Sequence, residues 1–403
     1  MRSKKFFLLG TIALIFIGAW PSAQASEHIV KNSSISIQNI DGNTLNTKCS
    51  AILKIENMTL KEKLAQLFIL TPEQLIDGYE DIVNTRAMTR LAFNDNPVSG
   101  IIYMTNNIVS PSQIRLQLYN MKQISYERTH LPPFLCIDEE GGSVARIGNN
   151  DRFDVPRFQN MASIGSGNNM VEVYNIGTSI GKYLANYGFN VDFAPVADIW
   201  TNPKNTVVRY RAFGSNAETV TKMAAYISRG IQSHGVLTCY KHFPGHGNTA
   251  SDTHNGYAYT LKNKDELMSC ELIPFIDGIK NKELFIMVGH ISLPNLVGDG
   301  TPASLSRKII TDLLRNELGY DGLIITDALN MKAISKQYSA DKAAVKAFEA
   351  GADILLVPEN FKRAYEGMLK AVRTGKISEA RINASLLRIV KTKLKLAQRD
   401  NMQ

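Results

Sequence analysis

Val236-Leu237-Thr238-Cys239-Tyr240 is followed at residues 241–254 by KHFPGHGNTASDTH. The apolar run has the length and β-branching of a buried strand. The polar stretch after it carries three histidines, a lysine and an aspartate, and its glycines allow a sharp turn and close approach to a ligand. Ionisable groups that directly follow a strand are typical of a functional loop on a rigid scaffold. The alternative is a surface loop with solvated histidines.

Seven further apolar runs alternate with helical patterns on either side of this stretch. The runs lie at residues 65–70, 98–104, 134–138, 191–195, 284–288, 323–326 and 354–357. Helices are predicted at 111–124, 170–187, 217–233, 264–279, 306–318, 341–350, 361–374 and 378–396. Strands that alternate with helices predict parallel βαβ units. Eight units are most simply an α/β fold, a single (β/α)8 TIM-type barrel. An open doubly wound sheet would have the same pattern.

The first residues have the features of an export signal. Three basic residues, Arg2, Lys4 and Lys5, precede an apolar run, and Ala23-Gln24-Ala25 is a small-residue cleavage motif. The run is short for a membrane span. We therefore expect cleavage after Ala25, a periplasmic or secreted product and no membrane association afterwards; an uncleaved anchor is the alternative.

The rest of the chain has no linker or shift in composition that would divide it. We expect a signal peptide at 1–25, an N-terminal lead-in at 26–57 and one barrel domain at 58–403. Apolar content of 44% and charged content of 20% are those of a globular chain, not a disordered one. Loss of the three signal cations lowers the formal charge from +8 to +5. The remaining basic residues form no block except near Lys391–Lys395, so we expect no nucleic-acid partner, and a monomer.

Four cysteines occur, and they do not have a metal-binding spacing. Cys136 and Cys239 lie inside apolar runs, where a free buried thiol is the usual state. We predict no disulfide framework; a bridge involving Cys49 is the alternative.

Polar residues follow five of the predicted strands. In a barrel of this type the chemistry is located at the C-terminal ends of the strands. The side chains found there are Asp138, Asp198, the pair Lys241 and His242, His290, and Asp327. We expect them to meet on one face of the molecule.

The residue types at these strand ends narrow the chemistry. No strand is followed by Gly-x-Gly-x-x-Gly or by a phosphate-binding loop. His242 and His246 cannot share a helix face because Pro244 and Gly245 separate them, so they do not form a zinc motif. We predict no metal and no cofactor. A carboxylate nucleophile with a proton donor suits acetal cleavage, in which the transition state resembles an oxocarbenium ion.

Five segments carry a resemblance to a known family. They are Ile137–Gly142 with Arg146, Asp192–Asp198, Arg211–Gly214, Lys241–His254 and Ile325–Met331. From about Met58 to Lys393 the chain resembles glycoside hydrolase family 3, in its single-domain β-N-acetylglucosaminidase (NagZ-type) branch. The resemblance implies an exo-acting, retaining β-N-acetylhexosaminidase. Its substrate would be a carbohydrate, either a peptidoglycan fragment or a chitin-like oligosaccharide.

The resemblance also implies roles for individual residues. Asp327 matches the nucleophile, His254 the general acid/base and Asp252 the partner of His254. A carboxylate beside an imidazole orients the ring and stabilises its charged form. Residues expected to bind the substrate are Asp138, Arg146, Arg211, Lys241 and His242. Asp198 is expected to support this pocket from behind.

The chain departs from the family pattern at several positions. Glu139 and Ser143 stand where the family commonly has glutamine and arginine, and Asn248 stands where an aspartate is common. These changes leave the implied catalytic groups in place and leave the fine specificity open. The alternatives are a β-glucosidase or a phosphate-using glycosidase of the same family, and a non-enzymatic barrel that binds cell wall.

Overall fold

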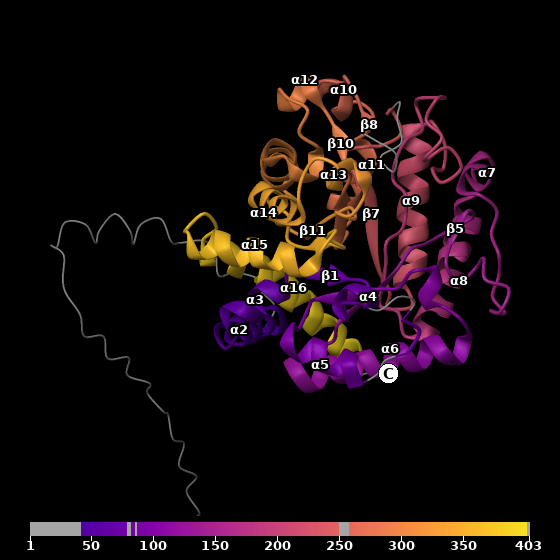
Figure 1. The fold of residues 1–403 in the computed structure, drawn as a ribbon. Coiled ribbons are helices and arrows are strands. Elements are labelled where there is room, and N and C mark those ends of the chain that lie inside the picture. The colour runs from indigo at the N-terminus through magenta and orange to yellow at the C-terminus, as the bar shows by residue number, and fades with distance from the viewer. Residues whose placement is uncertain (1–41, 79–81, 85–86, 250–257, 401–403) are drawn as a thin grey trace, which may run out of the picture. The chain divides into compact units, whose positions relative to one another are not determined.

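Eight parallel strands form the centre of the computed structural model, which describes residues 42–78, 82–84, 87–249 and 258–400 (Figure 1). They are β1 (Phe68–Leu70), β2 (Gly100–Ile102), β3 (Phe134–Ile137), β6 (Val191–Asp192), β7 (Leu237–Phe243), β9 (Phe285–Val288), β11 (Leu323–Thr326) and β12 (Leu355–Leu356). Each pairs in parallel with its neighbour in this order, and β1 also pairs with β12. A parallel bridge between Ile325 and Ile354 joins β11 to β12. The sheet is therefore a closed barrel, which confirms the predicted fold and excludes the open sheet.

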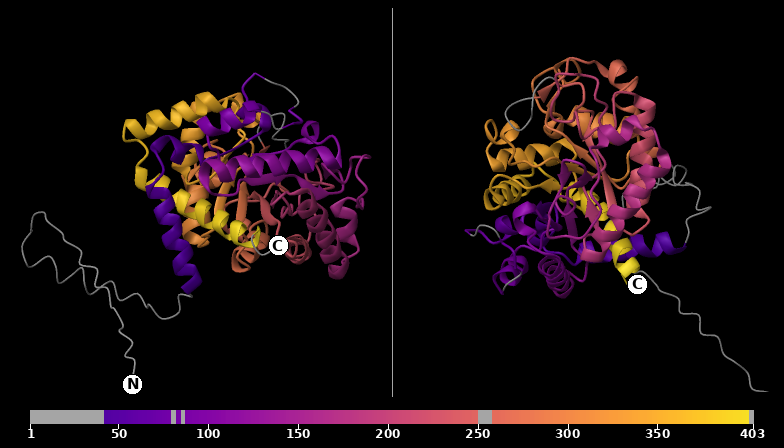
Figure 2. Two further views of the ribbon diagram at one scale, coloured as in Figure 1. Left: turned by 90° about the horizontal axis from the view of Figure 1, so that it is seen from below. Right: turned by 90° about the vertical axis from the view of Figure 1, so that its right-hand side faces the viewer.

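Helices cover the outside of the barrel, as the two further views show (Figure 2). The longer ones are α2 (Gly42–Glu56), α5 (Ala87–Asp95), α6 (Pro111–Thr129), α8 (Met170–Tyr187), α9 (Ala217–Gln232), α11 (Ile273–Lys280), α14 (Ala340–Ala350), α15 (Phe361–Arg373), α16 (Glu379–Asp400) and the π-helix η3 (Lys308–Glu317). The shorter ones are α3 (Leu60–Ala65), α4 (Pro72–Leu75), α7 (Met161–Ser166), α10 (Lys264–Met268), α12 (Pro294–Val297), α13 (Lys332–Ser335) and the 3-10 turns η1 (Thr105–Asn107) and η2 (Ala303–Leu305).

Two small strand pairs stand apart from the barrel. β4 (Glu139–Gly141) pairs with β5 (Val144–Ala145), and β8 (Ala258–Tyr259) pairs with β10 (Ile291–Ser292). Each pair includes a strand that begins within three residues of the end of a barrel strand, β3 or β9. They therefore extend the barrel at the end where the polar strand-end residues lie.

Three elements of the structure differ in detail from those predicted from the sequence. The run at 65–70 is a strand only from Phe68, because Thr59 and Glu62 form a capping box that starts helix α3. The helix predicted at 264–279 is broken into α10 and α11, and Pro274 lies in the first turn of α11, where a proline is tolerated. The predicted helix at 306–318 is the π-helix η3, in which the N–H of Leu318 bonds to the carbonyl of Leu313.

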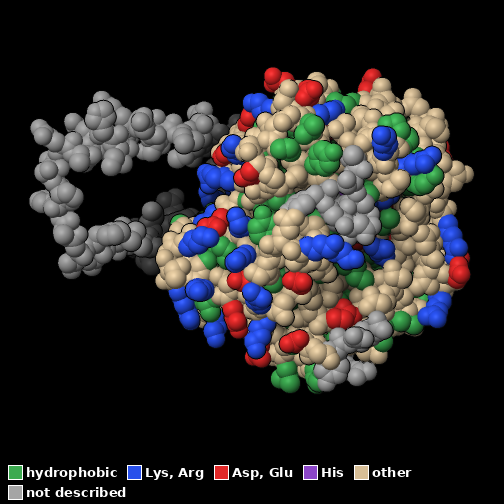
Figure 3. All heavy atoms as spheres, turned by 45° about the horizontal axis from the view of Figure 1, so that its top comes forward, with side chains coloured by type: hydrophobic (Ala, Val, Ile, Leu, Met, Phe, Trp, Pro, Cys, Tyr) green, Lys and Arg blue, Asp and Glu red, His purple; other side chains and the backbone are tan. Residues whose placement is uncertain are grey.

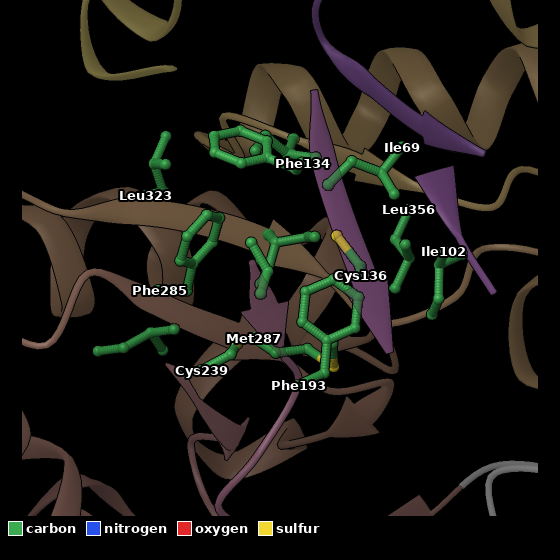
Figure 4. Close-up of a cluster of buried hydrophobic side chains, with 14 of the residues drawn as sticks. Ile69, Ile102, Phe134, Cys136, Phe193, Cys239, Phe285, Met287, Leu323 and Leu356 are labelled. Carbon is green, nitrogen blue, oxygen red and sulfur yellow. The ribbon is translucent and has the colours of Figure 1, made fainter. Parts of the chain in front are cut away.

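The interior of the barrel is filled by apolar side chains from many strands. Figure 4 shows this cluster, to which β1, β2, β3, β7, β9, β11 and β12 all contribute. Gly100 allows β2 to lie close to β3, since a Cβ at this position would lie 2.3 Å from the carbonyl oxygen of Phe134. All four cysteines are free, and Cys136 and Cys239 are buried in the core. In the described part of the chain, no helix combines the length and the hydropathy needed to cross a bilayer.

Candidate active site

A cavity of about 470 Å³ opens at the C-terminal ends of the strands. This volume lies within the range of roughly 300–1,000 Å³ that is usual for small-molecule sites. Six of the residues singled out from the sequence line it: Asp138, Arg146, Arg211, Lys241, His242 and Asp327. Apolar side chains also line it, among them Ile102, Met104, Phe193, Met287, Met331 and Leu356. Such a cavity can hold a polar ring by its edges and pack an apolar surface against its face.

Lys241 is the buried centre of an ion-pair network on one side of the cavity. Its Nζ lies 2.9 Å from Oδ1 of Asp138 and 2.7 Å from Oε1 of Glu140. Burial alone would lower the pKa of Lys241, but the two carboxylates raise it above its usual value. The ammonium group is therefore permanently charged and fixed in position.

Glu140 joins this lysine to Arg211. Both of its oxygens accept hydrogen bonds from the guanidinium, from Nε and Nη2, each at 2.7 Å. Burial would raise the pKa of Glu140, but Arg211 and Lys241 hold it well below its usual range. The sequence reasoning did not assign a role to Glu140. The available signal was its spacing, because residues 138 and 140 are two apart, as are neighbours on one face of a strand.

Arg146 approaches the network from the β4–β5 hairpin. Its Nη2 lies 3.4 Å from Oδ2 of Asp138. The buried Glu139 accepts hydrogen bonds from the backbone N–H groups of Ile147 and Gly148, at 2.9 and 2.7 Å, and from the hydroxyl of Tyr183. Glu139 thus fixes the backbone directly after Arg146. Nε of Arg146 is buried and has no partner among the described residues, so a polar ligand could accept a hydrogen bond from it.

His242 is held from behind by the fully buried Asp198. Its Nδ1 lies 2.7 Å from Oδ2 of Asp198, and Oδ1 of the same carboxylate accepts from the backbone N–H groups of His242 and His246. Strand β7 is irregular here: its register against β9 shifts between Tyr240 and Phe243, and the Lys241–His242 peptide is cis. Both side chains line the cavity, and Asp198 occupies the supporting position expected for it.

Asp327 lies at the end of β11 and is half-buried. Its Oδ1 accepts a 2.8 Å hydrogen bond from the N–H of Ala328. Burial would raise the pKa of Asp327, but His290 and His242 lower it below its usual value. Nε2 of His290 lies 2.9 Å from the carbonyl of Ala328, which can only accept, so this nitrogen carries a proton. The result is an ionised carboxylate exposed to the cavity, which can act as a nucleophile.

Asp252 and His254 lie outside the described residues. The described residues on either side of them are held at the same end of the barrel. Asn202 donates to the carbonyls of Asn248 and Thr249, while β8 begins at Ala258 and pairs with β10. Among the described residues, no group of three His, Cys, Asp or Glu side chains is arranged to hold a metal ion.

A closed (β/α)8 barrel that presents an ionised aspartate in a polar cavity at its strand ends has the architecture of the barrel glycoside hydrolases. Residues 59–392 match the family model described as the glycosyl hydrolase family 3 N terminal domain. The chain therefore belongs to glycoside hydrolase family 3, as the sequence resemblance predicted.

Several relatives share this barrel. The chain is 35% identical over 326 residues to β-hexosaminidase A of Pseudoalteromonas piscicida, covering 75% of this chain and 54% of that protein. It is 29% identical over 343 residues to β-hexosaminidase LpqI of Mycobacterium tuberculosis, covering 83% and 82%. A family 3 β-N-acetylglucosaminidase structure from Paenibacillus superposes with a TM-score of 0.78 at 36% identity, covering 85% of this chain and 62% of that one. The chain thus spans about half of the first relative and under two thirds of the Paenibacillus chain.

Proposed function

We propose that this protein is an exo-acting, retaining β-N-acetylhexosaminidase that releases terminal N-acetylglucosamine from peptidoglycan fragments or chitin-like oligosaccharides. The observation that carries the proposal is the ionised Asp327, which faces the same cavity as the network of Lys241, Asp138 and Arg211. The names of the Pseudoalteromonas and Mycobacterium relatives support the same activity.

The proposed reaction has two steps. Asp327 attacks the anomeric carbon and forms a covalent glycosyl-enzyme, while the bond to the leaving oxygen breaks and that oxygen takes a proton from His254. A water molecule then attacks the same carbon and gives a proton to His254, which releases Asp327. Asp252 orients the imidazole. Lys241, Asp138, Arg211, Arg146 and His242 hold the hydroxyl groups of the sugar.

Trapping with a 2-fluoro sugar, in which fluorine takes the place of the 2-acetamido group and which has an activated leaving group, tests the nucleophile. The fluorine slows hydrolysis of the intermediate, so peptide mapping should find the label on Asp327. The Asp327→Asn variant should not be labelled and should lose nearly all turnover. A label on any other residue would overturn the assignment.

Leaving-group dependence tests His254. Replacing His254 with alanine should slow substrates with poor leaving groups far more than substrates with activated aryl leaving groups, because only poor leaving groups need a proton. Equal losses with both substrates would contradict its role as the acid. The wild-type rate should not increase with added phosphate, as it would for a phosphorylase.

We also propose that the protein is exported and acts as a monomer. N-terminal sequencing of the mature protein should begin at Ser26. Retention of Met1 in a membrane fraction would show that the signal remains uncleaved.

A further inference from the structure

A second cavity lies at the opposite, N-terminal end of the barrel. Its volume is about 610 Å³, and it is bordered by η3, the end of α14 and the first turns of α16. Its cationic side chains are Arg307, Arg315, Lys376, Arg381 and Arg388, whereas Glu349 is the one acidic residue among those that line it. On the face of the molecule drawn in Figure 3, basic and acidic side chains are interspersed.

Three of these arginines share one buried carboxylate, that of Asp353. Arg315 lies 2.7 Å from it, Arg388 3.3 Å and Arg381 3.9 Å. Burial lowers the pKa of Arg315 and of Arg381, and the charge of Arg388 lowers both further, while Asp353 raises them. For each of these two arginines, burial has the largest effect on the pKa, and the attraction of Asp353 exceeds the repulsion from Arg388.

Acidic groups balance only part of the charge around the cavity. Lys376 pairs with Glu349, and Arg307 pairs with Asp312. Beyond Arg388 a neighbouring cavity of about 340 Å³ adds Lys282, Lys391 and Lys395, against Glu283 and Asp321. The residues that line the two cavities, together with their ion-pair partners Asp312 and Asp353, comprise eight cations and five acids, an excess of 8 − 5 = +3.

The guanidinium of Arg388 has hydrogen-bond donors available for a ligand. Its two hydrogen bonds to protein atoms in the described part of the chain, to Asp353 and to the carbonyl of Ala384, both use Nη1. About a quarter of its side chain is exposed. Nε and Nη2 can therefore form the paired hydrogen bonds with which a guanidinium binds an oxyanion.

We propose that this cavity binds a phosphate-type dianion, held chiefly by Arg388 and assisted by Lys376, which lines the same cavity. A dianion offsets most of the excess charge, whereas a single carboxylate would leave most of it in place. Arg388, Lys391 and Lys395 follow one another on one face of α16, at spacings of three and four residues. The phosphate could therefore be free or belong to a phosphate polymer. The site is independent of the glycosidase activity.

The experiment measures the thermal unfolding midpoint of the full-length protein against inorganic phosphate at fixed ionic strength. Binding to the folded state should raise the midpoint in a way that follows ligand concentration. Arg388→Gln should weaken the apparent phosphate affinity by about tenfold, the size of one charge-assisted hydrogen bond. Arg90→Gln, which removes a more exposed charge on α5 that pairs with Glu127, should respond like the wild type.

General stabilisation of proteins by phosphate is shared by all variants and cancels in this comparison. If Arg388→Gln does not fold, Lys376→Gln leaves the Asp353 cluster intact and should also weaken the response. Equal responses of the cavity variants and Arg90→Gln would overturn the proposal, as would the lack of any response. A polyphosphate titration distinguishes the sources: tighter binding that Lys395→Gln reduces identifies a polymer, and equal binding identifies free phosphate. Both of these results support the site.

Discussion

A single carboxylate, Glu140, connects the two cations on which the candidate site depends. Glu140→Gln keeps the shape of the side chain but leaves Arg211 and Lys241 without their shared counter-charge. Removing one partner of a buried ion pair costs about 3–5 kcal/mol. We expect a loss of this order in the free energy of unfolding in urea. We separately expect kcat/KM to fall by about 100-fold, because Lys241 and Arg211 lose the carboxylate that positions them in the cavity, and this fall corresponds to about 2.7 kcal/mol of transition-state stabilisation. Glu366→Gln, an exposed position on α15, should match the wild type. Unchanged kinetics of Glu140→Gln would show that this ion-pair network does not contribute to catalysis.

The packing of α8 against α9 depends on glycines that bring the two backbones together. A Cβ at Gly177 would lie 2.3 Å from the carbonyl oxygen of Ile227, and one at Gly181 would lie 2.5 Å from that of Ile231. Helix propensity alone would make Gly177→Ala stabilising by about 1 kcal/mol. The backbone contact predicts the opposite, a destabilisation of about 1–3 kcal/mol. Thermal unfolding of Gly177→Ala decides between the two, with Asn175→Ala on the exposed side of α8 as the control. A rise in midpoint for Gly177→Ala would mean that the helices can separate without cost.

Across the whole molecule, the last helix returns to the beginning of the barrel. Lys393 of α16 is fully buried, donates to Oε1 of Gln66 at 2.8 Å and lies 5.3 Å from the ring centre of Phe134. Lys63 similarly pairs with Glu379. These contacts hold α16 against α3 and against the beginnings of β1 and β3.

The buried lysine predicts a pH dependence of stability. Burial lowers the pKa of Lys393 from 10.5 to about 7. Between pH 7 and 10.5 the unfolded chain therefore binds a proton that the folded chain lacks, so this residue makes stability rise with pH across that window. Lys393→Met should be more stable than the wild type near pH 7, by about 1–4 kcal/mol, and the difference should shrink toward pH 10.5. Urea unfolding at several pH values measures it, with the exposed Lys395→Met as the control. Parallel pH profiles of Lys393→Met and the wild type would contradict this account.

The sequence by itself determined the order of the elements and the chemical character of the site. Apolar runs of strand length that alternate with helical patterns predicted eight βα units, and α8 has the predicted bounds, 170–187. Side chains directly after a strand could be assigned to one end of the barrel, because parallel strands place their C-terminal ends together. Asp327, Lys241 and Asp138 were found in this way.

Only the tertiary structure decided that the sheet closes into a barrel, which residues support the site, and which charges are paired. The bridge between Ile325 and Ile354 closes the sheet, and no local pattern encodes a contact between the ends of a ring. Glu140 took its role from Arg211, which is 71 residues away along the chain. The cluster around Asp353 gathers arginines from η3 and α16. Periodicity reports only which face of an element is buried, whereas a counter-charge is set by folding distant segments together.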